Sequence, residues 1–336
     1  MACNARRRHP HDNDTETPMK FRLACMAAAL ALSTSAFAWP DKTVTLVVPF
    51  PPGGATDTLA RTLTPKLQER FKQTVIVDNK AGATGTIGAT FVKRAPADGY
   101  TLLVTSLGPL VMAPHLLSKV AYDAGKDFDY LTVAVQAPNV LVVPAASPYK
   151  SVAELIAAEK AQPGKLTFAS AGNGTSDHLS AELFWLQSGT SGLHVPYKGA
   201  APAITDLLGG QIDAAFQNIN NVIQYIHAGK LRVLAIASAK RSPLLPGTPT
   251  LAESGVKDAE VNSWQGVVAP KGLPPEVKVQ IHAALMEALA DPQVKQKFVD
   301  MGFELVGNTP EQFSAYQASE SVRWKKLIET RKISAD

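Results

Sequence analysis

The chain is poor in cysteine: Cys3 and Cys25 are the two present among 336 residues. Both fall in an N-terminal segment that we expect to be removed on export. The mature protein is therefore predicted to have no thiol, no disulfide and no thiolate metal site. It must be held together by burial of apolar side chains, and the residues from 39 onward are enough for two domains of ordinary size.

Clusters of one charge and long apolar runs are also scarce. The chain has 33 Lys and Arg residues against 29 Asp and Glu residues, a net charge of +4, and no basic cluster of the kind that binds nucleic acid. Beyond the N-terminal segment, no apolar run approaches the roughly 20 residues that a membrane-spanning helix needs. These absences predict a soluble globular protein with no nucleic-acid partner.

Residues 19–38 have the pattern of a secretory signal peptide. A basic start is followed by the apolar stretch Leu23–Leu32 and by the small-x-small sequence Ala36-Phe37-Ala38. We predict cleavage after Ala38, with residues 1–38 as leader and signal peptide, and a periplasmic location. Either Met1 or Met19 is compatible with this pattern as the start of translation.

Apolar runs rich in Val, Ile, Leu and Thr alternate with helical patterns along the rest of the chain. Strands are predicted at Thr43–Phe50, Thr74–Asp78, Thr101–Thr105, Leu131–Val135, Val140–Val143, Leu166–Ser170, Gly192–Val195, Ala214–Phe216, Leu231–Ser238 and Gly266–Ala269. Helices are predicted at Asp57–Phe71, Thr86–Ala95, Val152–Ala161, Asp177–Gln187, Ala200–Leu208, Val222–Ala228, Pro275–Ala290, Gln293–Met301 and Pro310–Thr330. Nearly all-apolar strands between helices predict an α/β fold with a parallel sheet covered on both faces, and ligands at the carboxyl ends of its strands.

The most informative segment is Pro49–Asp57, a Pro/Gly loop between an apolar strand and a helix. Such a junction leaves backbone N–H groups without partners at the positive end of the helix dipole, where anions bind. Asp57 fits a helix-capping or first-turn acid, with ligand positioning as the other interpretation. The loop predicts a site for a carboxylate or phosphate.

The same arrangement returns at Ser170–Asp177, which leads into a helix carrying His178. The two copies lie more than 110 residues apart in the chain, which suits one in each domain. Two helix N-termini facing each other across a cleft would hold a ligand that has an anionic group at each end. We therefore expect both loops to contact one ligand.

Known nucleotide and catalytic motifs are absent. Gly53 and Gly54 lead to no P-loop lysine, and the sequence Gly172–Asp177 departs from the dinucleotide fingerprint at its last position. Ser170, Ser176, Asp177 and His178 hint at a hydrolase, but there is no nucleophile elbow, and adjacent helical residues point in different directions. No cofactor, no metal site and no catalytic residue is predicted.

Three further places are candidates for the ligand site. Lys80–Gly85, which contains Thr84, is a third Gly-rich loop between a strand and a helix, and a plain turn is the other interpretation. Ser106 follows the predicted strand that ends at Thr105. Tyr197 is a candidate for the wall of the pocket and Lys198 for a positive charge there, with a surface lysine as the alternative interpretation.

The chain resembles the tripartite tricarboxylate transporter substrate-binding family, also known as Bug or TctC-like periplasmic receptors. The resemblance covers essentially the whole mature chain in order, through Val48–Asp57 with Ala60-Arg61, Asp98–Leu103, Lys126–Phe128, Lys150–Leu155, Pro163–Leu166, Gly172–Thr175 with His178-Leu179, Val195–Pro202 and Asp206–Asp213. It departs in the third loop, where relatives read closer to Arg-Pro-Gly-Ala-Gly-Gly, and at Ala113, where relatives often have Asn.

The resemblance implies a periplasmic-binding-protein fold with two doubly wound α/β domains around a ligand cleft. The predicted domains are residues 39–138 with 262–336, and residues 139–261. It further implies a monomeric receptor that binds a di- or tricarboxylate, an amino acid or an aromatic acid and passes it to a membrane permease. The predicted ligand-binding residues are Phe50, Gly54, Ala55, Thr56, Asp57, Thr84, Ser106, Ser170, Ala171, Gly172, Gly174, Thr175, His178, Tyr197 and Lys198. The alternatives are a periplasmic hydrolase of a carboxylated substrate and a sensory partner of a receptor kinase.

Overall fold

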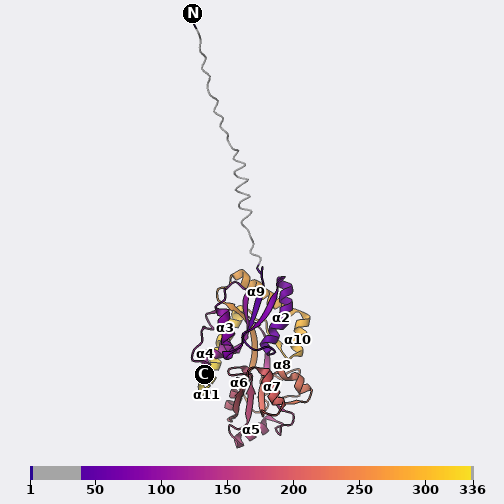
Figure 1. The fold of residues 1–336 in the computed structure, drawn as a ribbon. Coiled ribbons are helices and arrows are strands. Elements are labelled where there is room, and N and C mark those ends of the chain that lie inside the picture. Colours follow the sequence, from indigo (N-terminus) through magenta and orange to yellow (C-terminus); the bar gives the residue numbers. More distant parts are fainter. Residues whose placement is uncertain (3–38, 334–336) are drawn as a thin grey trace. The chain divides into compact units, whose positions relative to one another are not determined.

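The computed structural model describes residues 1–2 and 39–333 (Figure 1). The predicted signal peptide, its cleavage site after Ala38 and both cysteines lie outside the described residues. Among the helices that are described, none is long and apolar enough to cross a membrane.

One mixed β-sheet runs through the molecule, and its first half is built around β1 (Val44–Val48). β1 pairs in parallel with β2 (Val75–Asn79) and with β3 (Thr101–Ser106). β9 (Asn262–Pro270) is antiparallel to β3 and to the beginning of β4 (Phe128–Pro144). In this half of the sheet, the expectation of parallel strands therefore holds for β1 to β3 and is wrong for β4 and β9.

The second half of the sheet continues from the end of β4. β7 (Ala214–Asn218) and β8 (Leu231–Ile236) both pair with β4 in antiparallel fashion. β5 (Thr167–Ser170) lies parallel to β7 and to β6 (Leu193–Pro196). A short strand, β10 (Glu304–Leu305), pairs with the first part of β4.

β4 is one continuous strand, where the sequence predicted two, Leu131–Val135 and Val140–Val143. Its residues up to Pro138 pair with β9, whereas its residues from Asn139 onward pair with β7 and β8. The change of partners lets a proline occupy a strand interior, because Pro138 lacks the N–H that a central ladder position would use. The two halves of the sheet are thus joined through the backbone of a single strand.

Helices cover both halves. They are α2 (Ala55–Phe71), α3 (Thr86–Lys93), α4 (Ala113–Leu116), α5 (Val152–Ala161), α6 (Ser176–Ser188), α7 (Ala200–Leu208), α8 (Ile219–His227), α9 (Pro275–Ala290), α10 (Pro292–Asp300) and α11 (Pro310–Arg331), with a 3-10 turn η1 (Ala83–Gly85) and a π-helical turn η2 (Gly108–Met112). All but α4 and the two turns η1 and η2 begin within three residues of a position predicted from the sequence. In Figure 1, α2, α3, α9 and α10 surround the first half, whereas α5, α6 and α7 surround the second.

Aromatic side chains fill the core of each half. In the first, Phe313 meets Tyr130 and Trp264 edge-on, with ring centroids 4.8 Å and 5.3 Å apart. In the second, Phe168 meets Trp185 edge-on at 5.2 Å. These rings are buried and belong to one continuous apolar cluster that reaches through both halves. Such pairs contribute roughly 0.5–1.5 kcal/mol each beyond their buried area, so both halves are firmly packed behind the loops that face each other.

The C-terminal helix α11 also connects the halves. It packs against η2 in the first half, where Gln317 Nε2 donates to the Leu110 carbonyl at 2.7 Å. Its last residue, Arg331, forms an ion pair with Glu182 of α6, with Nε 2.9 Å from Oε2. The helix α11 is therefore held against α6, whose N-terminus follows the glycine-rich loop Ser170–Asp177.

Candidate functional site

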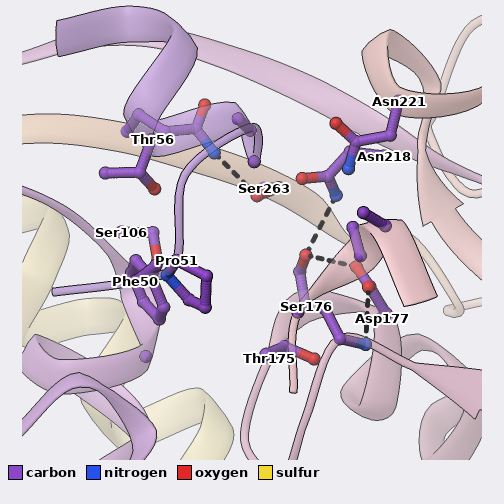
Figure 2. Close-up of a pocket in the computed structure, with 18 of the residues that line it drawn as sticks. Phe50, Pro51, Thr56, Ser106, Thr175, Ser176, Asp177, Asn218, Asn221 and Ser263 are labelled. Atoms are coloured by element: carbon purple, nitrogen blue, oxygen red, sulfur yellow. Dashed lines mark hydrogen bonds between the residues drawn. The ribbon is translucent and has the colours of Figure 1, made fainter. Parts of the chain in front are cut away.

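A pocket of about 120 Å³ lies between the two halves of the sheet (Figure 2). The first half contributes the β1–α2 loop, the residues after β3 and part of β9. The second half contributes the loops before α6 and α7 and the β7–α8 junction. Its lining residues are Phe50, Pro51, Pro52, Gly54, Ala55, Thr56, Ser106, Leu107, Gly108, Ala171, Thr175, Ser176, Asp177, Lys198, Gly199, Ala200, Ala201, Pro202, Asn218, Asn221, Ser263 and Gln265. The pocket thus sits at carboxyl ends of parallel strands and has room for a small molecule.

The β1–α2 loop presents the open N-terminus of α2 to this pocket. Gly54 is the N-cap residue of α2, and no side chain caps the helix. Gly53 N donates instead to Asp57 Oδ2 at 3.0 Å, while Gly54, Ala55 and Thr56 line the pocket. The first-turn N–H groups of an uncapped helix carry a partial positive charge, so this wall attracts an anion.

Asp57 braces the loop from behind and is not among the lining residues. Arg61 Nε donates to its Oδ2 at 2.9 Å, and Asn79 Nδ2 donates to its Oδ1 at 2.9 Å and to the Phe50 carbonyl at 3.0 Å. Burial raises the pKa of Asp57, but hydrogen bonds from Arg61, Gly53 N and Asn79 outweigh it and hold the pKa below its usual value. The carboxylate is therefore charged, paired and turned toward its own loop.

The β5–α6 loop satisfies most of its own backbone N–H groups. Gly172 N donates to Ser170 Oγ at 3.1 Å, Gly174 N to His178 Nδ1 at 3.1 Å, and Ala171 N to Asp177 Oδ2 at 3.2 Å. Thr175 caps α6 with its side chain. The two loops look alike in sequence, yet the second offers a ligand fewer free N–H groups than the first.

Two buried histidines, His178 and His194, contact the β5–α6 loop on its side away from the pocket. The rings of His178 and His194 stack 3.9 Å apart with an interplanar angle of 8°, and His194 Nε2 lies 2.6 Å from Ser170 Oγ. Burial, and to a smaller extent the neighbouring His178, lower the pKa of His194 to about 3. Ser170 is buried and does not line the pocket. This Ser–His contact lies behind the loop, where a substrate in the pocket does not reach the hydroxyl.

Asp177 is a buried carboxylate in the pocket wall. Its side chain accepts hydrogen bonds from Ala171 N at 3.2 Å and from Ser176 Oγ at 3.2 Å. Within the described part of the chain it forms no ion pair, and burial raises its pKa to about 6. The pocket therefore contains a negative group whose charge is not balanced by a neighbouring side chain.

The third loop lies beside the pocket and touches the second loop directly. Thr84 has a left-handed φ of 54° and donates from Oγ1 to the Asn173 carbonyl at 3.2 Å. Next to it Gly174, with φ 72°, leaves so little room that a Cβ atom would lie 2.5 Å from Leu116 Cδ1. These contacts join the first half to the second along one side of the pocket.

Tyr197 and Lys198 differ in their placement. Tyr197 donates from its hydroxyl to Asp206 Oδ2 at 2.6 Å, and this bond raises its pKa to about 12. It does not line the pocket, whereas the exposed Lys198 does. The N-terminus of α7, which follows Lys198, adds Gly199 and Ala200 to the wall without a side-chain cap.

The structure brings together part of the predicted set. The predicted residues that line the pocket are Phe50, Gly54, Ala55, Thr56, Ser106, Ala171, Thr175 and Lys198. Those that lie behind or beside it are Asp57, Thr84, Ser170, Gly172, Gly174, His178 and Tyr197. Within residues 1–2 and 39–333 there is no group of three or more His, Cys, Asp or Glu that could hold a metal ion.

Six polar residues of the pocket were not among the predicted ligand-binding residues: Ser176, Asp177, Asn218, Asn221, Ser263 and Gln265. Ser176 and Asp177 begin α6, and the other four come from β7, α8 and β9, where the predicted strands ended at Phe216 and began at Gly266. The signal was present, because Asn218 and Gln265 interrupt otherwise apolar strand sequences. A polar residue in an apolar run either has a partner in the core or faces a cavity.

A search of protein-family models matches residues 59–333 to the family described as "Tripartite tricarboxylate transporter family receptor". Among curated proteins, the protein BugT of Bordetella pertussis is 39% identical over 295 residues, which cover 88% of this chain and 90% of BugT. The family match begins within α2 and extends to the end of the described chain, so it includes the loops before α6 and α7.

Two solved structures share the fold over nearly their whole length. The Rhodopseudomonas palustris protein Rpa4515, solved with adipate, is 36% identical with a TM-score of 0.85, covering 88% of this chain and 99% of its own. MatC (Rpa3494) from the same organism, solved with bound malate, is 32% identical with a TM-score of 0.82, covering 86% and 100%.

Proposed function

Because the chain belongs to the tripartite tricarboxylate transporter receptor family, we propose that it binds one small carboxylate in the pocket between the two halves of its sheet. The membership confirms the resemblance noted in the sequence. The observation that carries the proposal is the uncapped N-terminus of α2, which opens into the pocket through Gly54, Ala55 and Thr56. Adipate and malate in the two related structures are carboxylates of suitable size.

The geometry supports binding at ordinary receptor strength. Hydrogen bonds to a charged group contribute roughly 1.5–3 kcal/mol each. A few such bonds from the starts of α2 and α7, less the cost of ordering and desolvating the ligand, give an affinity near micromolar, about −8 kcal/mol. No reaction is needed to explain the pocket, and we propose that the ligand leaves it unchanged.

Transport is the proposed role, with the protein acting in the periplasm as a monomer that passes its ligand to a membrane permease. The predicted domains, residues 39–138 with 262–336 and residues 139–261, would close over the ligand by bending where β4 changes partners. A sensory role beside a receptor kinase is the second candidate. Deletion of the gene separates them, since loss of carboxylate uptake supports transport and loss of signalling with intact uptake supports sensing.

A Gly54→Val substitution tests the site. Gly54 has φ −84° and an added Cβ would meet nothing within 4 Å, so valine fits the backbone but projects beside the helix N-terminus. We expect the variant to fold and to lose about 100-fold in carboxylate affinity, the equivalent of about 3 kcal/mol. Gly247→Val is the matched control, because Gly247 is exposed, equally open and remote from the pocket.

The measurement is a thermal-shift screen over mono-, di- and tricarboxylates, followed by calorimetry and by recovery of the ligand for mass spectrometry. Binding that survives unchanged in a folded Gly54→Val protein would refute the role of the α2 N-terminus. Conversion of a carboxylate by the purified protein would refute binding without chemistry.

A further inference from the structure

The helix α3 exposes large apolar side chains on the face that points away from the sheet. Its inward residues Gly88, Ala89 and Val92 are buried, as expected of a helix that covers a sheet. The outward residues Ile87 and Phe91 remain 53% and 46% exposed. They lie four residues apart and are therefore neighbours on one side of the helix, where a surface helix normally carries polar groups. Single exposed apolar residues are normal, but adjoining ones indicate a contact site.

These two side chains line a surface groove of about 660 Å³, which is separate from the pocket between the two halves. The groove lies between the outer side of α3 and residues 119–121, which precede β4. In Figure 1, α3 lies on the opposite side of the first half from α2 and α10. Thr86 and Thr90 add hydroxyl groups to the apolar wall. Such a mixture of apolar and hydrogen-bonding surface suits contact with a protein segment.

The groove carries positive charge that its own lining does not balance. Arg94 and Lys119 line it and are exposed, and neither forms an ion pair with another described residue. None of the lining residues is Asp or Glu. The groove between α2 and α9 differs, because its cations are paired within it, as where Arg70 Nε lies 2.8 Å from Glu287 Oε2. The α3 groove is therefore complementary to a surface that brings its own carboxylates.

The start of α3 is connected to the ligand pocket. A Cβ atom on Gly85, the N-cap residue of α3, would lie 3.4 Å from Cζ of Phe50, whose ring lines the pocket. The turn just before it carries Thr84, whose Oγ1 donates to the Asn173 carbonyl of the second half at 3.2 Å. A protein seated on α3 would therefore lie next to the contact through which the two halves meet.

We propose that the outer face of α3, together with residues 119–121, is the surface on which the membrane permease docks. The inference rests on the proposed transport function and goes beyond it by naming the surface and the chemistry of the partner. The partner segment inserts apolar side chains against Ile87 and Phe91 and places Asp or Glu side chains against Arg94 and Lys119. The apolar contact contributes most of the affinity, and the charge pairs fix the orientation.

Two other occupants fit the groove less well. In a symmetric dimer the same surface of both copies would meet, so Arg94 and Lys119 would face identical cations without any acid between them. A lipid surface carries negative charge, but it is flat and would leave the concave part of the groove unfilled. A protein segment with acidic and apolar side chains matches both the charge and the shape.

Charge reversal tests the complementarity. The variant Arg94→Glu with Lys119→Glu replaces both cations, and Lys295→Glu on α10 is the control, because Lys295 is exposed and has no ion pair among the described residues. Cells carrying each gene in place of the wild type are assayed for uptake of the carboxylate that binds best in the screen. Calorimetry measures the dissociation constant of that carboxylate for each full-length mature protein. We expect the double variant to lose about tenfold or more in uptake rate, while its dissociation constant and both properties of the control stay unchanged.

Removal of the apolar contact is tested in the same assays. Ile87→Ser with Phe91→Ser should reduce uptake to a similar extent and leave carboxylate binding and the melting temperature unchanged, because both side chains are exposed. Val279→Ser on α9, where the valine is 67% exposed, is the matched control and should behave as the wild type.

A photo-crosslinking amino acid in place of Ile87 identifies the occupant in intact cells. We expect a crosslink to a permease segment that contains Asp or Glu, and replacement of that acid by Lys should restore uptake with Arg94→Glu and Lys119→Glu. A crosslink to a second copy of the chain overturns the inference. So does a charge-dependent binding to vesicles of phosphatidylglycerol and phosphatidylcholine without a protein crosslink.

Deletion of the whole gene separates the docking surface from the transport function. If deletion abolishes uptake but both α3 variants transport normally, the docking surface is refuted and transport stands. If deletion leaves uptake unchanged, the transport function itself fails, and the inference fails with it.

Discussion

Replacing Asp177 by asparagine should make the ligand-free protein more stable at neutral pH. Burial raises the pKa of this carboxyl from an ordinary 3.8 to about 6. A rise of roughly two units corresponds to about 3 kcal/mol, at 1.36 kcal/mol per unit. Asparagine keeps the shape of the side chain but cannot accept both existing hydrogen bonds, and the loss of one costs about 1 kcal/mol. The expected net gain at pH 7 is about 2 kcal/mol.

The sign of the pH dependence follows from proton binding. Because the folded pKa is raised, the folded state binds the proton more tightly than the unfolded state between about pH 4 and pH 6. The wild-type free energy of unfolding therefore falls as pH rises through that window. Below it the side chain is neutral in both states, so the advantage of the Asp177→Asn variant disappears.

Urea unfolding of both proteins between pH 4 and pH 8, followed by circular dichroism, measures this difference. Other titrating groups, including His194, are common to both proteins and cancel in the comparison. A variant that is less stable at pH 7, or a difference that does not change with pH, would refute the argument that Asp177 is buried without compensation. A more stable variant would show that the charge of Asp177 lowers the free energy of unfolding of the ligand-free protein, as is common for groups kept at binding sites.

The remaining predictions concern the framework around the pocket. Asp57→Asn should destabilise the protein at pH 7 by roughly 1–3 kcal/mol, opposite in sign to Asp177→Asn, and because the folded pKa of Asp57 is lowered, urea melts should show this loss shrinking below about pH 4. Gly174→Ala should cost roughly 1–3 kcal/mol in thermal unfolding, since its Cβ would lie 2.5 Å from Leu116 Cδ1 and its φ is 72°; unaltered stability would show that the loops do not press together. Arg331→Ala should cost about 1 kcal/mol at pH 7 and less in acid, because hydrogen bonds from His178 and Arg331 outweigh the burial of Glu182 and lower its pKa; a loss that does not change between pH 7 and pH 4 would count against the ion pair.

Local signals were enough to place most helices. The predicted bounds Val152–Ala161, Ala200–Leu208 and Pro275–Ala290 coincide with α5, α7 and α9. Each has a boundary residue that acts locally, such as Ser151, whose hydroxyl accepts from Glu154 N at the start of α5. The α/β fold and the two glycine-rich loops were predicted for the same reason.

The features that the sequence did not reveal, the continuity of β4 and the direction of the loop N–H groups, depend on contacts between residues far apart in the chain. The segment around Pro138 was predicted as two strands, Leu131–Val135 and Val140–Val143, because nothing local shows that β4 exchanges β9 for β7 and β8 at that residue. The loops Pro49–Asp57 and Ser170–Asp177 read alike, yet one turns its N–H groups to the pocket and the other turns them to Ser170, His178 and Asp177. That difference is set by side-chain direction, which spacing alone does not determine.

The ion pair at the end of α11 has a practical consequence for the design of a fluorescent sensor from this protein. Arg331 at the end of α11 pairs with Glu182 of α6, and α6 begins at the pocket, so a movement of α6 on ligand binding would be passed to the end of α11. A fluorescent domain fused there, paired with a second fluorophore on α2, would convert occupancy of the pocket into an optical signal. The protein could therefore be made into a fluorescent sensor that needs no added reagent, with α11 carrying the change at the pocket to the fused fluorophore.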